Sequence, residues 1–178
     1  MIDTTTQGLR LADAPALGEY WEGQGGVYAG IIPDYVGTEP RFLIFAADEG
    51  VDLAWGGFGS AEEGVQDARY GHDNTERLVA CKRPTHTHDA AKFAAEYEKD
   101  GHRDFYLPSS RELQAAAVHI ADTFDQTQWY WSSTEKSKIL AYGKTFSGDV
   151  EMNALFKHMT GRVRPVRTVP VASDAPAA

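Results

Sequence analysis

The sequence contains very little cysteine and no long run of apolar residues. Among its 178 residues Cys81 is the only cysteine, which excludes an internal disulfide and a structural zinc site built from several cysteines. No apolar stretch approaches the roughly 20 residues of a membrane-spanning helix. The opening residues MIDTTTQGLR lack a charged segment followed by an apolar one. We therefore expect no secretory signal, no membrane insertion and synthesis in the cytoplasm.

Positive charge is scarce as well. The chain carries 26 acidic residues against 17 lysines and arginines, which gives a formal net charge of −9. Nucleic-acid phosphates are bound by a basic surface, and the nearest approach to one is Arg162, Arg164 and Arg167. We expect no nucleic-acid partner.

The length and composition predict one globular domain. Hydrophobic residues make up 42% of the chain and aromatic residues 11%. A chain of this size can bury a core without disulfides, so residues 1–170 are assigned to a single domain. Residues 171–178, VASDAPAA, are small and polar, and we expect them to form a flexible C-terminal tail.

Hydrophobic spacing predicts an α+β fold with antiparallel strands. A hairpin is expected from the apolar stretches 27–32 and 41–46, and the glycine-rich WGGFG at 55–59 is expected to be irregular. Residues 89–99 and the stretch after Ser109 have helical spacing, and Ser109 and Glu112 have the spacing of a capping box. Asp89 is expected to cap the first of these helices. Other expected elements are a short helix over 74–80 and strands over 129–133, 141–146, 154–158 and 162–167.

The run WYWSSTE at 129–135 places aromatic residues directly beside a polar cluster. In a strand, Trp129 and Trp131 lie on one face and Tyr130 on the other. Exposed indoles would stack on sugars or fill a partner's pocket, whereas buried indoles would form part of the core. Because tryptophan is mostly buried in folded proteins, we favour the core.

Two groups of residues have chemistry that a catalytic or metal site uses. In an extended segment His86 and His88 point the same way, as two ligands of one metal ion would. No further ligand follows at a recognisable spacing, so a polar loop leading into a helix is the favoured interpretation. Cys81 has the basic neighbours Lys82 and Arg83, a setting typical of a reactive cysteine. A nucleophile also needs a positioned base, so a structural or surface role is favoured.

Four motifs occur in a fixed order: DFYLPSSREL at 104–113, WYWSSTE at 129–135, TFSG at 145–148 and GRVRPVR at 161–167. Together they resemble the Lcl C-terminal domain family of bacterial and phage proteins, over roughly residues 89–168, and the front half resembles a longer phage and prophage version. The resemblance implies a C-type-lectin-like fold, with two helices flanking small antiparallel sheets and irregular display loops. Oxidase relatives of this fold use a cysteine pair and animal lectins use calcium motifs. Since this chain has neither, no cofactor and no metal are implied.

The resemblance also implies a function. We expect a non-enzymatic binding module of a phage or prophage virion, in a tail fibre or tail tip, that recognises a host-surface receptor (a protein or a glycan). Other tail proteins are expected partners, and a homo-oligomer such as a trimer is the expected assembly. Display loops vary on a fixed framework, and the expected ligand-binding residues are Glu135, Lys136, Lys138, Tyr142, Lys144, Asp149, Glu151, Asn153 and His158. The alternatives are a structural virion component without receptor binding and an enzyme on the same fold that uses Cys81 or a histidine-bound metal.

Overall fold

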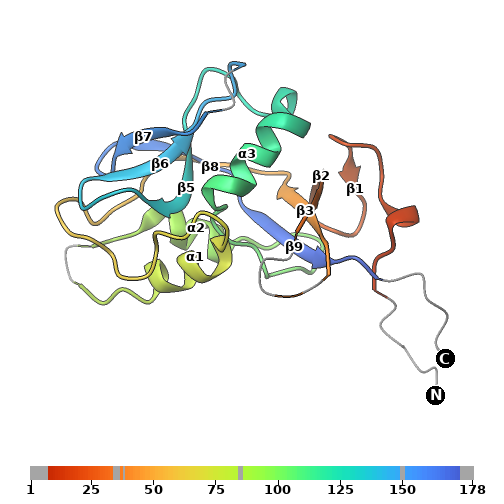
Figure 1. The fold of residues 1–178 in the computed structure, drawn as a ribbon, viewed down its shortest axis with the longest axis horizontal. Helices are drawn as coiled ribbons and strands as arrows, with labels where there is room; N and C mark the ends of the chain where they lie inside the picture. Colours follow the sequence, from red (N-terminus) through yellow and green to blue (C-terminus); the bar gives the residue numbers. More distant parts are fainter. Residues whose placement is uncertain (1–7, 34–36, 38, 84–85, 149–150, 173–178) are drawn as a thin grey trace.

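The computed structural model describes residues 8–33, 37, 39–83, 86–148 and 151–172 (Figure 1). Within these residues the chain has both helices and strands, so the predicted α+β class is confirmed. The expected tail falls mostly on residues 173–178, which lie outside the described residues. In chain order the elements are a 3-10 turn η1 (Leu11–Asp13), β1 (Tyr20–Trp21), β2 (Gly26–Ile32), β3 (Arg41–Ala46), β4 (Gly50–Ala54), α1 (Gly71–Val79), α2 (Asp89–Glu96), α3 (Ser110–His119), a 3-10 turn η2 (Ala121–Thr123), β5 (Tyr130–Glu135), β6 (Leu140–Lys144), β7 (Asn153–Phe156), β8 (Thr160–Val163) and β9 (Val166–Pro170).

The strands of the described residues form two sheets. One has the order β1-β2-β3-β9 and the other has the order β4-β8-β5-β6-β7. The β5–β8 pair is parallel and the other pairs are antiparallel. Figure 1 shows the two sheets at opposite ends of the molecule with α3 between them. The predicted hairpin is confirmed, since β2 and β3 pair antiparallel from Gly26↔Ala46 to Ile32↔Arg41.

The chain changes sheets between β8 and β9, and the prediction of one strand over 162–167 is wrong. Proline has no N–H to donate to a ladder, and Pro165 falls at the break. The buried guanidinium of Arg164 instead donates to the carbonyl oxygens of Ala46 and Thr123, both at 2.8 Å. The break therefore lets one continuous segment join both sheets.

The described residues form three hydrophobic clusters, of which the smallest packs around Trp21 on the first sheet. The core of the first sheet lies against α3 and includes Leu43, Phe45, Leu113 and Ile120. The core of the second sheet lies against α1 and α2, and is built around Trp55 and other buried side chains: Leu78, Ala90, Ala94, Leu107, Trp131 and Val163. Among the helices of the described ranges, none has both the length and the apolar character needed to cross a membrane.

The strand β5 is buried on both faces. Tyr130 belongs to the first core and Trp131 to the second, and both are essentially unexposed. Their polar atoms are satisfied, because the Tyr130 hydroxyl donates to Glu49 at 2.9 Å and Trp131 Nε1 donates to the Leu53 carbonyl at 2.9 Å. Trp129 packs against the second core and is partly buried. The core interpretation of this aromatic run is confirmed.

The ends of α3 and α2 differ in how well the local sequence predicts them. The capping box of α3 is present, with Ser109 N–H donating to Glu112 Oε2 at 2.6 Å and Glu112 N–H donating to Ser109 Oγ at 3.3 Å. The expected cap at Asp89 is wrong, because α2 begins at Asp89 and follows His88, whose side chain turns inward. This helix also ends early, at Glu96, since Tyr97 is extended and its hydroxyl donates to Asp48 at 2.8 Å.

Candidate functional site

The predicted ligand-binding residues do not lie on one surface. The side chains of Glu135 and Lys144 are buried, which leaves neither of them available to a ligand at the surface. Asp149 lies outside the described residues, and Tyr142 and Asn153 are half-buried. The exposed members of the set are Lys136, Lys138, Glu151 and His158.

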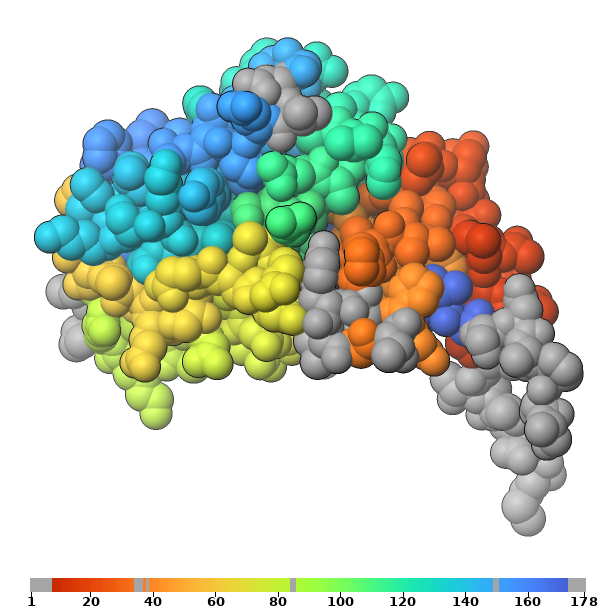
Figure 2. Space-filling view, viewed as in Figure 1, coloured from red at the N-terminus to blue at the C-terminus, as the bar shows by residue number. Residues whose placement is uncertain are grey.

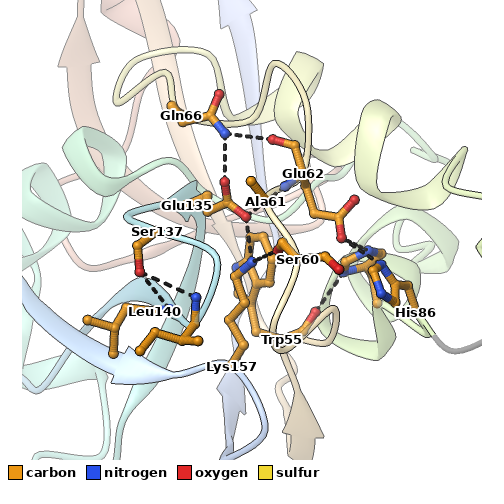
Figure 3. A network of polar contacts seen from close by, with 12 residues as sticks. Trp55, Ser60, Ala61, Glu62, Gln66, His86, Glu135, Ser137, Leu140 and Lys157 are labelled. Carbon is orange, nitrogen blue, oxygen red and sulfur yellow. Dashed lines mark hydrogen bonds and ion pairs between the residues drawn. The ribbon is translucent and has the colours of Figure 1, made fainter.

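Glu135 belongs to a buried polar network beneath the second sheet (Figure 3). Its carboxylate forms an ion pair with Lys157, whose side chain is fully buried. The same carboxylate accepts from the Glu62 N–H at 2.9 Å and from Gln66 Nε2 at 2.6 Å. Lys157 Nζ also donates to the Ser60 carbonyl at 2.8 Å. Because every charged group has partners, this network is a framework element; we refer to it as the Glu135–Lys157 network.

The residues on either side of Lys157 point outward. Phe156 is 45% exposed, and its ring centroid lies 5.7 Å from that of the exposed His158 in a stacked arrangement. Phe58, from the loop after β4, is 48% exposed and lies with its ring centroid 4.6 Å from His158 and 6.4 Å from Phe156. Three exposed rings from two distant parts of the sequence therefore meet at the surface.

The outer side of β6 and β7 extends this surface. In the β6–β7 register Leu140 lies opposite Phe156 and Tyr142 lies opposite Ala154, and opposed residues of an antiparallel pair share a face. Tyr142 therefore lies on the side of Phe156, and Lys136 Nζ is 5.5 Å from the centroid of its ring. We call Phe58, Tyr142, Phe156 and His158 the outer aromatic face. Asn153 lies opposite Gly143 on the other side of the sheet.

Backbone hydrogen bonds fix the segments that carry the outer aromatic face. Gly59 N–H donates to the Lys138 carbonyl at 2.8 Å, and Gly56 N–H donates to the Lys157 carbonyl at 3.1 Å. In Figure 2 the surface of residues 130–145, in cyan, borders the yellow surface that follows β4. Gly56 has φ of +89°, and a Cβ there would lie 2.0 Å from the Thr87 carbonyl oxygen. The irregular WGGFG loop is thus held in place by close packing that requires glycine.

A second polar group lies where the β4–α1 loop meets the α1–α2 loop. Glu62, Cys81, His86 and His88 each offer a metal-ligating atom, and these atoms all lie within 4.8 Å of one another. His86 Nδ1 is 2.7 Å from Glu62 Oε1, while Cys81 Sγ is 3.7 Å from Glu62 Oε2. The sequence pointed to the two histidines and to the cysteine separately, and it placed Glu62 among many acidic residues expected at the solvated surface, whereas the structure buries it. We call these residues the Glu62 cluster.

His88 has only one of its ring nitrogens satisfied. The side chain is fully buried, and Nδ1 lies 2.9 Å from the Trp55 carbonyl oxygen. A carbonyl only accepts, so Nδ1 carries the proton and Nε2 presents its lone pair. Burial lowers the pKa of this imidazole, which favours the neutral form. Among the residues that the structure describes, none makes a hydrogen bond with Nε2, and Glu62 Oε1 lies 3.8 Å away.

A cleft of about 410 Å³ lies beside α1 and contains another buried carboxyl group. Burial raises the pKa of Glu112, and that of Tyr106 is raised well above its ordinary value. Both carboxylate oxygens are occupied, since Tyr106 donates its hydroxyl proton to Oε1 at 2.6 Å and the Ser109 N–H donates to Oε2. Glu112 is therefore engaged in holding the start of α3.

Comparison with known proteins adds no assignment to these observations. No protein-family model matches the chain, and no curated protein matches it. The resemblance to the Lcl C-terminal domain family thus remains a prediction from the four motifs.

Proposed function

We propose that this protein is a non-enzymatic ligand-binding module with a C-type-lectin-like architecture, and that its outer aromatic face contacts the ligand. The observation that carries the proposal is the meeting of three exposed rings, Phe58, Phe156 and His158, on a rigid support. Exposed aromatic residues that contact one another are unusual on a surface that only meets water.

The chemistry of this surface suits a receptor with both apolar and polar parts. Aromatic rings stack on the apolar faces of sugars and fill pockets on protein partners. Lys136 lies beside Tyr142, and Lys138 is exposed in the same turn, so cationic groups border the rings. The Glu135–Lys157 network holds the backbone below, and a preorganised surface loses less conformational entropy when it binds.

The proposed setting is a phage or prophage virion. The four sequence motifs support a tail-fibre or tail-tip protein that recognises a host-surface receptor, either a protein or a glycan. In this setting the module is assembled with other tail proteins and forms a homo-oligomer such as a trimer. Loops on a fixed framework carry binding because their side chains can change without loss of the fold.

A binding assay with matched variants tests this proposal. Fluorescently labelled protein is titrated onto a panel of whole bacterial cells and onto a glycan array. Phe156→Ala and Phe58→Ala are expected to weaken binding at least tenfold, which corresponds to about 1.4 kcal/mol, because both remove exposed contact area. The control is Val118→Ala, which truncates an exposed apolar residue on α3 (67% exposed) and should bind as the unaltered protein does.

The main alternative is a structural virion component, in which the same face contacts neighbouring subunits. In that case Phe156→Ala would lower the oligomer mass measured by light scattering and leave attachment to cells unchanged. Equal cell binding and equal oligomer mass for both aromatic variants and the control would contradict a binding role of this face.

A further inference from the structure

The Glu62 cluster joins two loops that lie beside the second sheet, the β4–α1 loop and the α1–α2 loop. Glu62 lies in the loop between β4 and α1, Cys81 follows α1, and His86 and His88 precede α2. Figure 3 shows the carboxylate of Glu62 facing the imidazole of His86. The side chains of Glu62, His86 and His88 are at most 9% exposed, so they are largely withdrawn from water.

The contacts within the Glu62 cluster leave the buried lone pair on His88 Nε2 without a partner among the described residues. Burying a polar atom without a partner costs about 1–3 kcal/mol. The Trp55 carbonyl fixes the ring so that Nε2 is directed toward Glu62 Oε1, which is also an acceptor when ionised. The two acceptors face each other at 3.8 Å, and while Glu62 Oε1 has a partner in His86 Nδ1 at 2.7 Å, Nε2 has none among the described residues. A metal-binding histidine has this same arrangement, with its other ring nitrogen donating to a carbonyl.

We propose that Glu62, Cys81, His86 and His88 bind one Zn²⁺ ion. Imidazole nitrogen, thiolate sulfur and carboxylate oxygen are the ligands that zinc prefers, whereas calcium and magnesium prefer oxygen ligands throughout. The charges also match, because the Glu62 carboxylate and a Cys81 thiolate together balance a divalent ion.

The distances between the four ligand atoms are close to those in a tetrahedral zinc site. Zinc–ligand bonds of about 2.0–2.3 Å separate tetrahedral ligand atoms by about 3.3–3.8 Å. The four atoms already lie within 4.8 Å of one another, so the widest separation closes by about 1 Å, while the His86 Nδ1–Glu62 Oε1 contact of 2.7 Å lengthens by about 0.6 Å. Cys81 is half-buried and lines a cleft of about 620 Å³, which leaves its side chain room to move and gives an ion a way in.

Four protein ligands make this a structural site. A catalytic zinc keeps one position open for water, while a closed set of four fastens the segments that supply it. The ion would tie the loop after β4 to both ends of the α1–α2 connection. Arg83 Nη1 now lies 3.7 Å from Glu62 Oε1, and its side chain is 51% exposed, so it can turn toward solvent when the ion binds.

The test begins with the full chain under reducing conditions. The protein is stripped with a chelator and titrated with Zn²⁺, and stoichiometry is read by native mass spectrometry and calorimetry. We expect one ion per chain and a higher Tm with zinc than without, because a ligand that binds only the folded state stabilises it. Substitution with Co²⁺ is expected to give the intense visible bands of a tetrahedral site and a thiolate charge-transfer band.

Matched variants assign the ligands. Cys81→Ser and His86→Gln are expected to weaken zinc binding at least tenfold, and Cys81→Ser to abolish the charge-transfer band. The controls are Ala80→Ser, at an exposed neighbour in the same cleft, and His72→Gln, from the exposed group His72, Asp73 and Glu76. Both controls should bind one ion with unchanged affinity and keep both spectral features. Circular dichroism of each variant without metal checks that the fold is retained.

The proposal is overturned if the unaltered chain binds no zinc, if Cys81→Ser keeps the affinity and the spectrum, or if His72→Gln is the variant that loses the ion. In the first case the partners of the Glu62 carboxylate are the Arg83 guanidinium and the His86 ring alone. The result does not depend on the outer aromatic face, since attachment to cells is a separate measurement and Phe156 makes no contribution to the ligand set.

Discussion

The two buried polar regions beside the second sheet share Glu62 but differ in how completely their polar atoms are hydrogen-bonded. The backbone N–H of Glu62 donates to Glu135 in the Glu135–Lys157 network, and its side chain belongs to the Glu62 cluster. In the network an ammonium group and a carboxylate meet, with hydrogen bonds on the remaining atoms. In the cluster the His88 Nε2 lone pair faces a carboxylate oxygen.

This difference in hydrogen bonding distinguishes buried polar groups that only stabilise the fold from groups that can bind a ligand. A buried ion pair with all its hydrogen bonds made has no remaining capacity for a ligand. A cluster rich in acceptors, with one buried lone pair unpartnered among the described residues, has that capacity. Glu135 therefore belongs to the framework and not to the expected binding surface, while the Glu62 side chain belongs to a group that can still bind an ion.

The largest change in stability is expected when one partner of the Glu135–Lys157 network is removed. Lys157→Met leaves the Glu135 carboxylate buried without its counter-ion, which typically lowers the free energy of unfolding by about 3–5 kcal/mol. Urea denaturation measures this change. The double variant Glu135→Gln with Lys157→Met should recover much of the loss, because no uncompensated charge remains. Lys138→Met, at an exposed lysine, is the matched control. A Lys157→Met variant as stable as that control would contradict the structural assignment.

A smaller effect is expected at the start of α3, where the polar groups are satisfied but no ion pair is involved. Ser109→Ala removes the side-chain acceptor for the Glu112 N–H and should lower the free energy of unfolding by about 1 kcal/mol. Thermal and urea denaturation both report this change, and Ser147→Ala at an exposed serine should leave stability unchanged. An effect as large as that of Lys157→Met would show that capping and ion-pair burial are equally important here.

The smallest effect is expected in the Glu62 cluster without metal. Cys81 is half-buried, and its contact with Glu62 is a weak sulfur interaction at 3.7 Å. Cys81→Ser in chelator-treated protein should therefore change the free energy of unfolding by less than about 0.5 kcal/mol. Urea denaturation with and without chelator makes the comparison. A large loss of unfolding free energy in the metal-free protein would show that Cys81 stabilises the fold by itself. The Glu62 cluster would then not differ from the Glu135–Lys157 network in this respect.

Elements with strong local signals were predictable from the sequence. The capping box at Ser109 and Glu112 fixed the start of α3, because its two hydrogen bonds join residues three positions apart. The β2–β3 hairpin was visible as two apolar stretches joined by a turn-rich segment. The short helix expected over 74–80 is also present, and α1 begins slightly earlier, at Gly71.

The parts that depend on distant contacts were not predictable. Pro165 at the β8–β9 break was visible in the sequence, but the partners of Arg164 there, Ala46 and Thr123, are far away along the chain. Tyr97, where α2 has ended, donates its hydroxyl to Asp48, which is also distant in the sequence. Similarly, Phe58 joins Phe156 only after β4 and β7 are placed in the fold. Hydrophobic periodicity describes residues that are near one another along the chain, so it carries no information about these long-range contacts.

The position of Lys157 between Phe156 and His158 limits how the outer aromatic face can evolve. Substitutions at the two flanking positions alter what the surface presents while the lysine keeps its partners inside. Adding or removing one residue in this turn would carry the ammonium group toward water and an aromatic ring toward Glu135. Under the proposed binding role, related chains with different ligands should therefore differ here in residue identity and keep the length of the turn constant.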